Sequence, residues 1–242
     1  MSKNCAIWAF WLGNRVQYSY YLSIMKEYLS DCDFYIGINN DFEWYKALLL
    51  SSGLNIKSIE QVPQNIIVPS DASAYQSALN GYKKVYKEKY DKVYFIHNKG
   101  SSHYDWQKRG HDYVWGFLQN IEKINEVFKD ENCGGFSNWG EINEGVWDDQ
   151  LTEFYDFKYK KGIDIMWLCT LYAIKGHVLD TFILNCKETF FTKQLDKYFF
   201  EAAFPSIVDR QGYTRFVNNW WGRSITYSDK KYNEIVAKWK NQ

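Results

Sequence analysis

The chain has 242 residues, a length that fits one large domain or two small ones. Its apolar fraction of 46% and charged fraction of 24% are ordinary for a soluble globular protein and argue against a disordered chain. The formal net charge is zero at pH 7, which gives no electrostatic support for a nucleic-acid partner.

Aromatic residues are unusually frequent, at 19% of the chain. Two interpretations fit: rings in a cleft, where they stack on sugars or nucleobases, or a tyrosine-rich core. The five cysteines are widely spaced with no CxxC pair, which predicts buried free thiols in a reducing compartment rather than disulfides or a zinc site. No apolar run reaches about 18 residues and no secretory signal pattern opens the sequence, so we expect a soluble, cytoplasmic protein.

Short apolar runs alternate with helical patterns, which predicts an α/β fold with a mainly parallel sheet and covering helices. In the first part of the chain the patterns predict strands at 5–12, 33–38, 55–62 and 92–97, and helices around 20–28, 42–50 and 71–86. Ser70 or Asp71 can cap the last of these helices, because either side chain can accept a hydrogen bond from the first-turn amides.

The second part of the chain is less regular. We expect a helix over 106–128, a strand over 133–139 with close backbone packing at its paired glycines, and a strand that turns into a helix across 166–183. The stretch 190–213 is predicted to be mostly helical, with Pro205 ending or kinking the helix. The amphipathic tail 230–242 either packs on the domain or contacts an anionic membrane surface.

Polar residues follow three of the predicted strands. In an open parallel sheet, ligands bind beyond the carboxyl ends of the strands, so these turns are expected to converge on one crevice. The turns, with a helix start that can join them, are Gly13-Asn14, Asn39-Asn40-Asp41, His97-Asn98-Lys99-Gly100 and Asp71.

Such a group of side chains suits a nucleotide diphosphate. Asn39 or Asp41 could hydrogen-bond a base or ribose, and Lys99 could neutralise a phosphate as a point charge. The two side chains before Lys99 could donate to phosphate or sugar oxygens, and Gly100 would let the backbone approach closely. The alternative is an ordinary polar loop. The chain has no GxxxxGK[ST] motif and no GxGxxG after a strand, which argues against P-loop and dinucleotide-binding proteins.

Three short segments carry a likeness to a known family. They are the strand end with the pattern H-x-K-G at 97–100, the stretch TLYAIK at 170–175 preceded by Cys169, and FEAAFP at 200–205. Together they resemble GT-A-type glycosyltransferases that build polysaccharides, particularly the rhamnan-synthesis group and related domains of large viral glycosyltransferases. The second segment is similar to that group's GTMFWAR stretch, with Cys169 where Gly is usual. The third is similar to a helix with an acidic residue near the acceptor.

The resemblance spans roughly residues 4–216 and implies a GT-A-like fold in one domain, 1–242. A nucleotide-sugar-binding half would reach to about 140, and an acceptor-side half would span about 141–242. The implied activity is transfer of a sugar from a nucleotide-diphosphate-sugar to a hydroxyl of a glycan acceptor, in the synthesis of a surface polysaccharide or glycan. A non-catalytic carbohydrate- or nucleotide-binding module is the alternative function.

The resemblance also bears on cofactors. Common GT-A enzymes end the fourth strand in Asp-x-Asp, which binds a divalent cation that bridges the diphosphate. Here His97, Asn98 and Lys99 occupy that place, and Lys99 could supply the positive charge, so we expect no metal cofactor. Mn²⁺ or Mg²⁺ at Asp148 and Asp149 is the alternative, although that pair is also typical of an exposed acidic turn.

Sugar transfer needs a carboxylate near the acceptor hydroxyl. Glu201 is the candidate base, with Asp196 and Asp149 behind it, and neighbouring phenylalanines could raise the pKa of Glu201. A solvated helix residue or a salt-bridge partner is the alternative role for Glu201. Trp139, Trp167 and Thr170 are the predicted acceptor-binding residues, although tryptophans at such positions could belong to the core instead.

Overall fold

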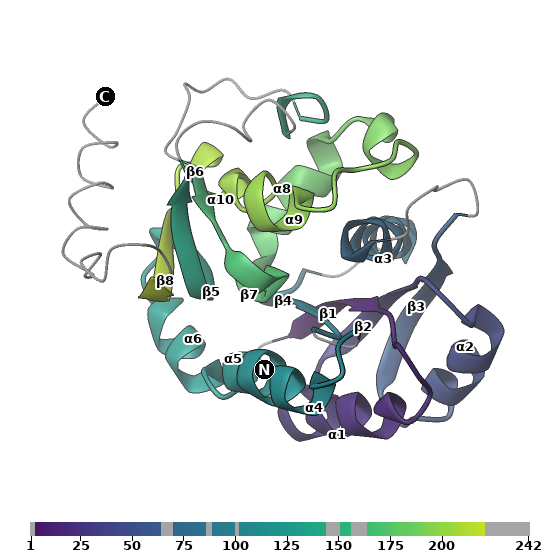
Figure 1. Ribbon diagram of the computed structural model, residues 1–242. Coiled ribbons are helices and arrows are strands. Elements are labelled where there is room, and N and C mark those ends of the chain that lie inside the picture. The colour runs from purple at the N-terminus through teal and green to yellow at the C-terminus, as the bar shows by residue number, and fades with distance from the viewer. Residues whose placement is uncertain are drawn as a thin grey trace.

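The computed structural model describes residues 3–63, 70–85, 89–99, 102–143, 151–155 and 164–220. Within these ranges, eight strands form a mixed sheet of order β3-β2-β1-β4-β7-β5-β6, with β8 also paired to β5. Figure 1 shows helices on both faces of the sheet. The α/β class and the mainly parallel, mixed sheet are confirmed.

The helices and strands have the following bounds. The strands are β1 (Asn4–Phe10), β2 (Asp33–Ile38), β3 (Asn55–Gln61), β4 (Lys92–His97), β5 (Cys133–Asn143), β6 (Asp164–Met166), β7 (Tyr172–Lys175) and β8 (Thr214–Trp220). The α-helices are α1 (Gln17–Leu29), α2 (Phe42–Leu50), α3 (Asp71–Val85), α4 (Trp106–Arg109), α5 (Gly116–Leu118), α6 (Ile121–Val127), α8 (Gly176–Asn185), α9 (Phe199–Ala202) and α10 (Ser206–Arg210). The described residues also include a π-helical turn η1 (Gly110–Trp115) and the 3₁₀ turns η2 (Leu168–Thr170) and η3 (Glu188–Phe191).

The first four strands of the chain run parallel. β1 pairs with β2 and β4, and β2 pairs with β3, all in parallel register. Their carboxyl ends therefore lie at one edge of the sheet, as the sequence predicted. β7, from the second half of the chain, pairs antiparallel with both β4 and β5, so one sheet runs through both predicted halves.

Two hydrophobic cores cover the two faces of the sheet. Along β1, Cys5, Ile7 and Ala9 point into one core, while the alternating residues between and after them point into the other. The first core includes residues of α3, α8, α9 and α10, which lie above the sheet in Figure 1. The second includes residues of α1, α2, α5 and α6, and α1, α5 and α6 lie below it. Burial on both faces explains why β1 reads as a continuous apolar run.

Two predicted helices differ from the structure. The single helix expected over 106–128 is wrong, because η1 and the turn before α6 divide it into α4, η1, α5 and α6. A Cβ at Gly110 would lie 2.8 Å from the Tyr20 ring, so this glycine lets η1 approach α1 closely. Besides the end of η3, the stretch 190–213 holds the short helices α9 and α10, divided by Pro205, whose missing N–H cannot continue a helix.

The five cysteines are free, which confirms that they form no disulfide; Cys186 is half-buried and the others are buried. The described ranges contain no helix with the length and apolar character that crossing a membrane requires. The tail 230–242 lies outside the described residues.

Candidate functional site

A cavity of about 370 Å³ opens at the carboxyl edge of the parallel strands. We call it the strand-end cavity. It is lined by residues that follow β1, β2 and β4, by the start of α3, and by residues of η2 and α9. Its volume lies in the range of small-ligand sites. Seven residues singled out from the sequence line it: Asn39, Asp71, His97, Asn98, Lys99, Thr170 and Glu201.

The end of β4 places three of these residues. His97 continues the alternation of Val93 and Phe95, so its ring lies on the face covered by α3. Asn98 follows on the other face, where its Oδ1 accepts from Trp8 Nε1 at 3.2 Å and from the Trp11 amide at 3.3 Å. These bonds tie the ends of β4 and β1 together and leave the next residue, the lysine, at the mouth of the cavity.

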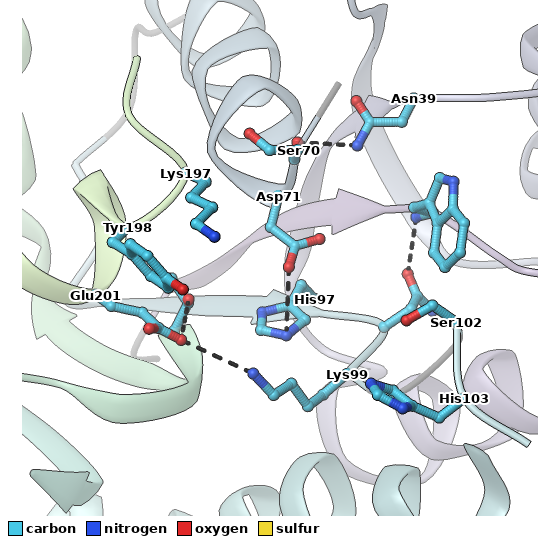
Figure 2. A pocket seen from close by; sticks show the side chains of 13 residues that line it. Asn39, Ser70, Asp71, His97, Lys99, Ser102, His103, Lys197, Tyr198 and Glu201 are labelled. Carbon is cyan, nitrogen blue, oxygen red and sulfur yellow. Dashed lines mark hydrogen bonds and ion pairs between the residues drawn. The ribbon is translucent and has the colours of Figure 1, made fainter. Parts of the chain in front are cut away.

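The start of α3 places Asp71. Ser70 is the cap, because its Oγ accepts from the Ser73 amide at 3.4 Å, and its carbonyl accepts from Asn39 Nδ2 at 2.9 Å. Since Ser70 performs the capping, the Asp71 carboxylate is available to face the cavity, as Figure 2 shows. Gly37 of β2 allows this arrangement, because a Cβ there would lie 1.9 Å from a backbone carbonyl of α3.

Lys99 and Glu201 face each other across the strand-end cavity. Lys99 Nζ lies 3.8 Å from Glu201 Oε1, and the two side chains are 29% and 15% exposed. Figure 2 shows them pointing toward one another, Lys99 from the turn after β4 and Glu201 from α9. Burial raises the pKa of Glu201, opposed first by the Lys99 charge and then by a hydrogen bond from Thr170 Oγ1 at 3.3 Å. Glu201 is therefore a partly buried carboxylate with one nearby cation.

The turn before β7 has an unusual backbone. Cys169 and Thr170 both have positive φ, at 69° and 49°. Non-glycine residues rarely adopt this region, and each such residue costs roughly 1–3 kcal/mol. The turn aims the Thr170 hydroxyl at Glu201 and its carbonyl at Tyr75, whose hydroxyl donates to it at 2.8 Å. The strained backbone therefore lies in the lining of the strand-end cavity, where Thr170 contacts both Glu201 and Tyr75.

His97 is neutral. Burial lowers its pKa to about 4, with Asp71 acting in the opposite direction and Lys99 in the same direction. Its Nε2 lies 3.7 Å from Asp71 Oδ2, which is beyond hydrogen-bonding distance. The cavity therefore holds two ammonium groups, from Lys99 and Lys197, two carboxylates, from Asp71 and Glu201, the neutral imidazole of His97 and a second imidazole, from His103.

Several predicted site residues lie away from the strand-end cavity. Gly13 and Asn14 form an exposed turn, where the Gly13 amide donates to Gln17 Oε1 at 2.9 Å. Asp41 lines a separate depression beside α2 and faces Arg15 at 3.5 Å. Asp196 is exposed and accepts a hydrogen bond from the Tyr198 amide at 2.8 Å.

The predicted acceptor tryptophans are also elsewhere. Trp167 is fully buried and packs on Tyr172 and Gly135, which leaves no ring face for a ligand. Trp139 is half-buried and packs edge-on against Tyr113, with ring centroids 5.5 Å apart. Gly100 and Asp149 lie outside the described residues.

Six residues of the strand-end cavity were not among the site residues predicted from the sequence. Trp11 and Ser70 adjoin predicted positions, so the strand-end pattern could have found them. Lys197 and Tyr198 precede Glu201 by four and three residues, but only the packing of α9 places them there. The six are Trp11, Ser70, Ser102, His103, Lys197 and Tyr198.

The arrangement offers cations for an anionic group and carboxylates for a hydroxyl. Within the described ranges, no group of three or more His, Cys, Asp or Glu side chains is placed to hold a metal ion. Lys99 and Lys197 both line the cavity and supply positive charge that an anionic group would meet there. In comparisons with known proteins, no protein-family model matches the chain and no curated protein matches it.

Proposed function

We propose that the protein is a glycosyltransferase with a GT-A-like fold, which transfers a sugar from a nucleoside-diphosphate-sugar to a hydroxyl of a glycan acceptor. The observation that carries the proposal is the facing pair of Lys99 and Glu201, whose charged atoms lie 3.8 Å apart in the strand-end cavity. Glycosyl transfer needs one group for the departing diphosphate and one for the acceptor proton. An ammonium and a partly buried carboxylate are suited to these two tasks.

Lys99 is the group for the diphosphate. It stands where the resembled enzymes carry a metal-binding Asp-x-Asp, and its three N–H donors can bind phosphate oxygens. Asn39 and Trp11, at the ends of the neighbouring strands, then lie on the nucleoside side. When a diphosphate enters, Lys99 exchanges its contact with Glu201 for contacts with phosphate oxygens. We therefore propose transfer without a divalent cation.

Glu201 is the general base. Burial raises the pKa of its carboxyl, and Lys99 opposes that effect in the ligand-free protein. Once Lys99 binds phosphate, less of its positive charge acts on Glu201, so the carboxylate becomes a stronger base when the donor is bound. Thr170 Oγ1, which donates to Glu201 Oε1 at 3.3 Å, holds the carboxylate in place.

The reaction follows from these roles. The acceptor oxygen attacks the anomeric carbon while its proton passes to Glu201. The bond between the anomeric carbon and the diphosphate oxygen breaks, and the electron pair leaves with the nucleoside diphosphate. Lys99 and Lys197 stabilise the negative charge that develops on the leaving oxygen. The products are the glycosylated acceptor and a free nucleoside diphosphate.

The test measures nucleotide release from UDP-glucose, GDP-mannose, dTDP-glucose and related donors, with and without oligosaccharide acceptors and EDTA. We expect acceptor-dependent release that survives EDTA. Glu201→Gln should lose turnover while it binds the donor more tightly than the wild type, and Lys99→Met should lose turnover and weaken donor binding. Lys108→Met, an exposed lysine paired with Asp112, is the matched control and should change neither.

Two results would contradict the proposal. Binding of a nucleotide-sugar that depends on Lys99, with no release under any acceptor, would indicate a non-catalytic binding module. Absence of binding to every nucleotide and nucleotide-sugar would remove both functions.

A further inference from the structure

His97 has a buried nitrogen that the proposed reaction does not use. The ring is 1% exposed and lines the strand-end cavity. In the described part of the chain, its Nε2 has no hydrogen-bond partner. Figure 2 shows the Asp71 carboxylate above the ring, and its Oδ2 lies 3.7 Å from Nε2. A buried nitrogen without a hydrogen-bond partner lowers the stability of the fold, and a ligand that bonds to it removes that cost.

The neighbours of the ring assign its tautomer. Tyr75 donates its only hydroxyl proton to the Thr170 carbonyl at 2.8 Å, and burial raises the pKa of Tyr75 well above its usual value, so this proton stays. The Tyr75 oxygen, 3.5 Å from His97 Nδ1, can then only accept from that nitrogen. The Thr170 carbonyl, which also contacts the ring, accepts too. Nδ1 therefore carries the proton and Nε2 presents a lone pair.

Two acceptors consequently converge in the cavity with no proton between them. Nε2 offers a lone pair and Asp71 offers a carboxylate. Asp71 is 46% exposed, so its carboxylate can turn to admit a group beside Nε2. A phosphate oxygen cannot fill this position, because it has no proton to donate and Asp71 repels it. Sugar hydroxyls fit, because each can donate one hydrogen bond and accept others from the nearby lysines.

A divalent cation is the other group that two such acceptors could hold. The charges around His97 and Asp71 disfavour a divalent cation, because the ammonium groups of Lys99 and Lys197 line the same cavity. The lysine two residues beyond His97 also acts on the imidazole as a positive charge. A neutral donor satisfies both acceptors without adding a third positive charge.

We propose that His97 Nε2 and Asp71 Oδ2 form a hydroxyl clamp, which selects the nucleotide-sugar by hydroxyl groups of one of its sugar rings. This inference rests on the proposed function, since it specifies a subsite of the same cavity. The ring is either the ribose of the nucleotide or the transferred sugar. Both present the same chemistry, a hydroxyl or a pair of neighbouring hydroxyls that donates to the two acceptors.

The test compares binding of complete and deoxygenated ligands by isothermal titration calorimetry. The first arm uses UDP, GDP and dTDP, together with the 2′-deoxy and 3′-deoxy forms of the ribonucleotide that binds; dTDP itself already lacks the 2′-hydroxyl, so the comparison for dTDP is with its 3′-deoxy form. The second arm uses UDP-glucose, GDP-mannose and dTDP-glucose with their monodeoxy analogues. The variants are Asp71→Asn, whose amide can donate to Nε2 and close the clamp, and His97→Phe, which keeps a ring but removes the acceptor. Exposed matched controls are Asp112→Asn and His111→Gln.

The wild-type protein should bind one deoxy analogue roughly ten- to a hundredfold more weakly than the parent ligand, the loss of a charge-assisted hydrogen bond. This discrimination should vanish in Asp71→Asn and His97→Phe and persist in both controls. The arm in which it occurs identifies the ribose or the transferred sugar. Two clamp variants are used so that one failure to fold leaves the other to decide.

Three results would overturn the inference. Equal binding of every deoxy analogue, or discrimination that survives in both clamp variants, would leave the proposed function standing without the clamp. Binding that requires Mn²⁺ and is abolished by EDTA would make the pair a cation site. Absence of binding by every nucleotide and nucleotide-sugar would show that the proposed function fails, and the clamp with it.

Discussion

Removing the proposed catalytic base should tighten the binding of a nucleoside diphosphate. In the ligand-free protein, Lys99 Nζ contacts Glu201 Oε1 at 3.8 Å, so a diphosphate must compete with this carboxylate for the ammonium. Glu201→Gln removes the competitor and one negative charge from the cavity. The same substitution should abolish transfer, because glutamine cannot accept the acceptor proton. Loss of turnover with tighter binding is an unusual combination and is therefore informative.

The magnitude follows from the exposure of the pair. The side chains of Lys99 and Glu201 are 29% and 15% exposed, so solvent screens the pair less than a surface salt bridge. Exposed pairs contribute about 0.2–1 kcal/mol, and we take the upper end, about 1 kcal/mol. That value corresponds to roughly fivefold tighter binding. Lys99→Met should instead weaken binding by roughly ten- to a hundredfold, the loss of a charged hydrogen bond to phosphate.

The assay is calorimetric titration of UDP, GDP and dTDP into four proteins: wild type, Lys99→Met, Glu201→Gln and the double variant. In the double variant, the tightening of binding caused by Glu201→Gln should shrink, because the Lys99 ammonium is no longer there to be released from the carboxylate. The four proteins form a double-mutant cycle, which measures the coupling free energy between Lys99 and Glu201. The gain should also fall as the salt concentration rises. Unchanged or weaker binding in Glu201→Gln would refute the idea that Lys99 exchanges Glu201 for the diphosphate, and it would assign the pair a structural role.

Three further predictions concern stability, each measured by urea unfolding. Because the pKa of His97 falls from 6.5 to about 4 on folding, only the unfolded chain protonates it in that interval, so stability should fall by about 3 kcal/mol as pH drops from 6.5 to 4. His97→Phe should remove that part of the slope, and an unchanged slope would contradict the assignment of a neutral ring. Gly37→Ala should cost roughly 3 kcal/mol or more and weaken nucleotide binding, since its Cβ would lie 1.9 Å from the backbone of α3. Gly53→Ala, at φ +82° in open space, should cost only about 1–2 kcal/mol and leave nucleotide binding intact. If Gly37→Ala and Gly53→Ala lowered stability and binding equally, the explanation that an alanine at position 37 displaces α3 would be wrong. Asp209→Asn should cost about 3 kcal/mol because it leaves the fully buried Arg215 without its carboxylate, and a loss below about 1 kcal/mol would show that other partners suffice.

The sequence predicted the residues whose positions depend on local pattern and sheet direction. β2, α2 and β4 have the predicted bounds, 33–38, 42–50 and 92–97. Asn39, Asp71 and His97 meet because parallel strands end at one edge, and that rule needs no tertiary information. Cys169, which stands where the resembled enzymes have glycine, has φ 69°, a conformation that glycine adopts easily.

Other positions depend on packing that a pattern does not contain. β1 ends at Phe10, two residues before the predicted end, so Trp11 reaches the cavity and Gly13 lies in the exposed turn beyond it. Trp167 looks the same in a sequence whether it covers a ligand or fills a core. The paired glycines of β5 held the relevant signal, since a Cβ at Gly135 would lie 2.4 Å from the Trp167 ring. Its neighbour Gly134 makes room for a different ring, since a Cβ there would lie 2.6 Å from Tyr213.

The charge balance of the strand-end cavity explains how it can exist without a ligand. Unpaired charges in a partly buried site destabilise a fold, but here Lys99 lies against Glu201, and Lys197 and Asp71 line the same space. In the proposed reaction, an entering diphosphate would draw the lysines to itself and leave the carboxylates with less compensation. Those carboxylates would then need hydrogen-bond donors, which acceptor and sugar hydroxyls can supply. Under this proposal, the same exchange of partners that binds the anionic leaving group also prepares the carboxylates for the hydroxyls that react or are recognised.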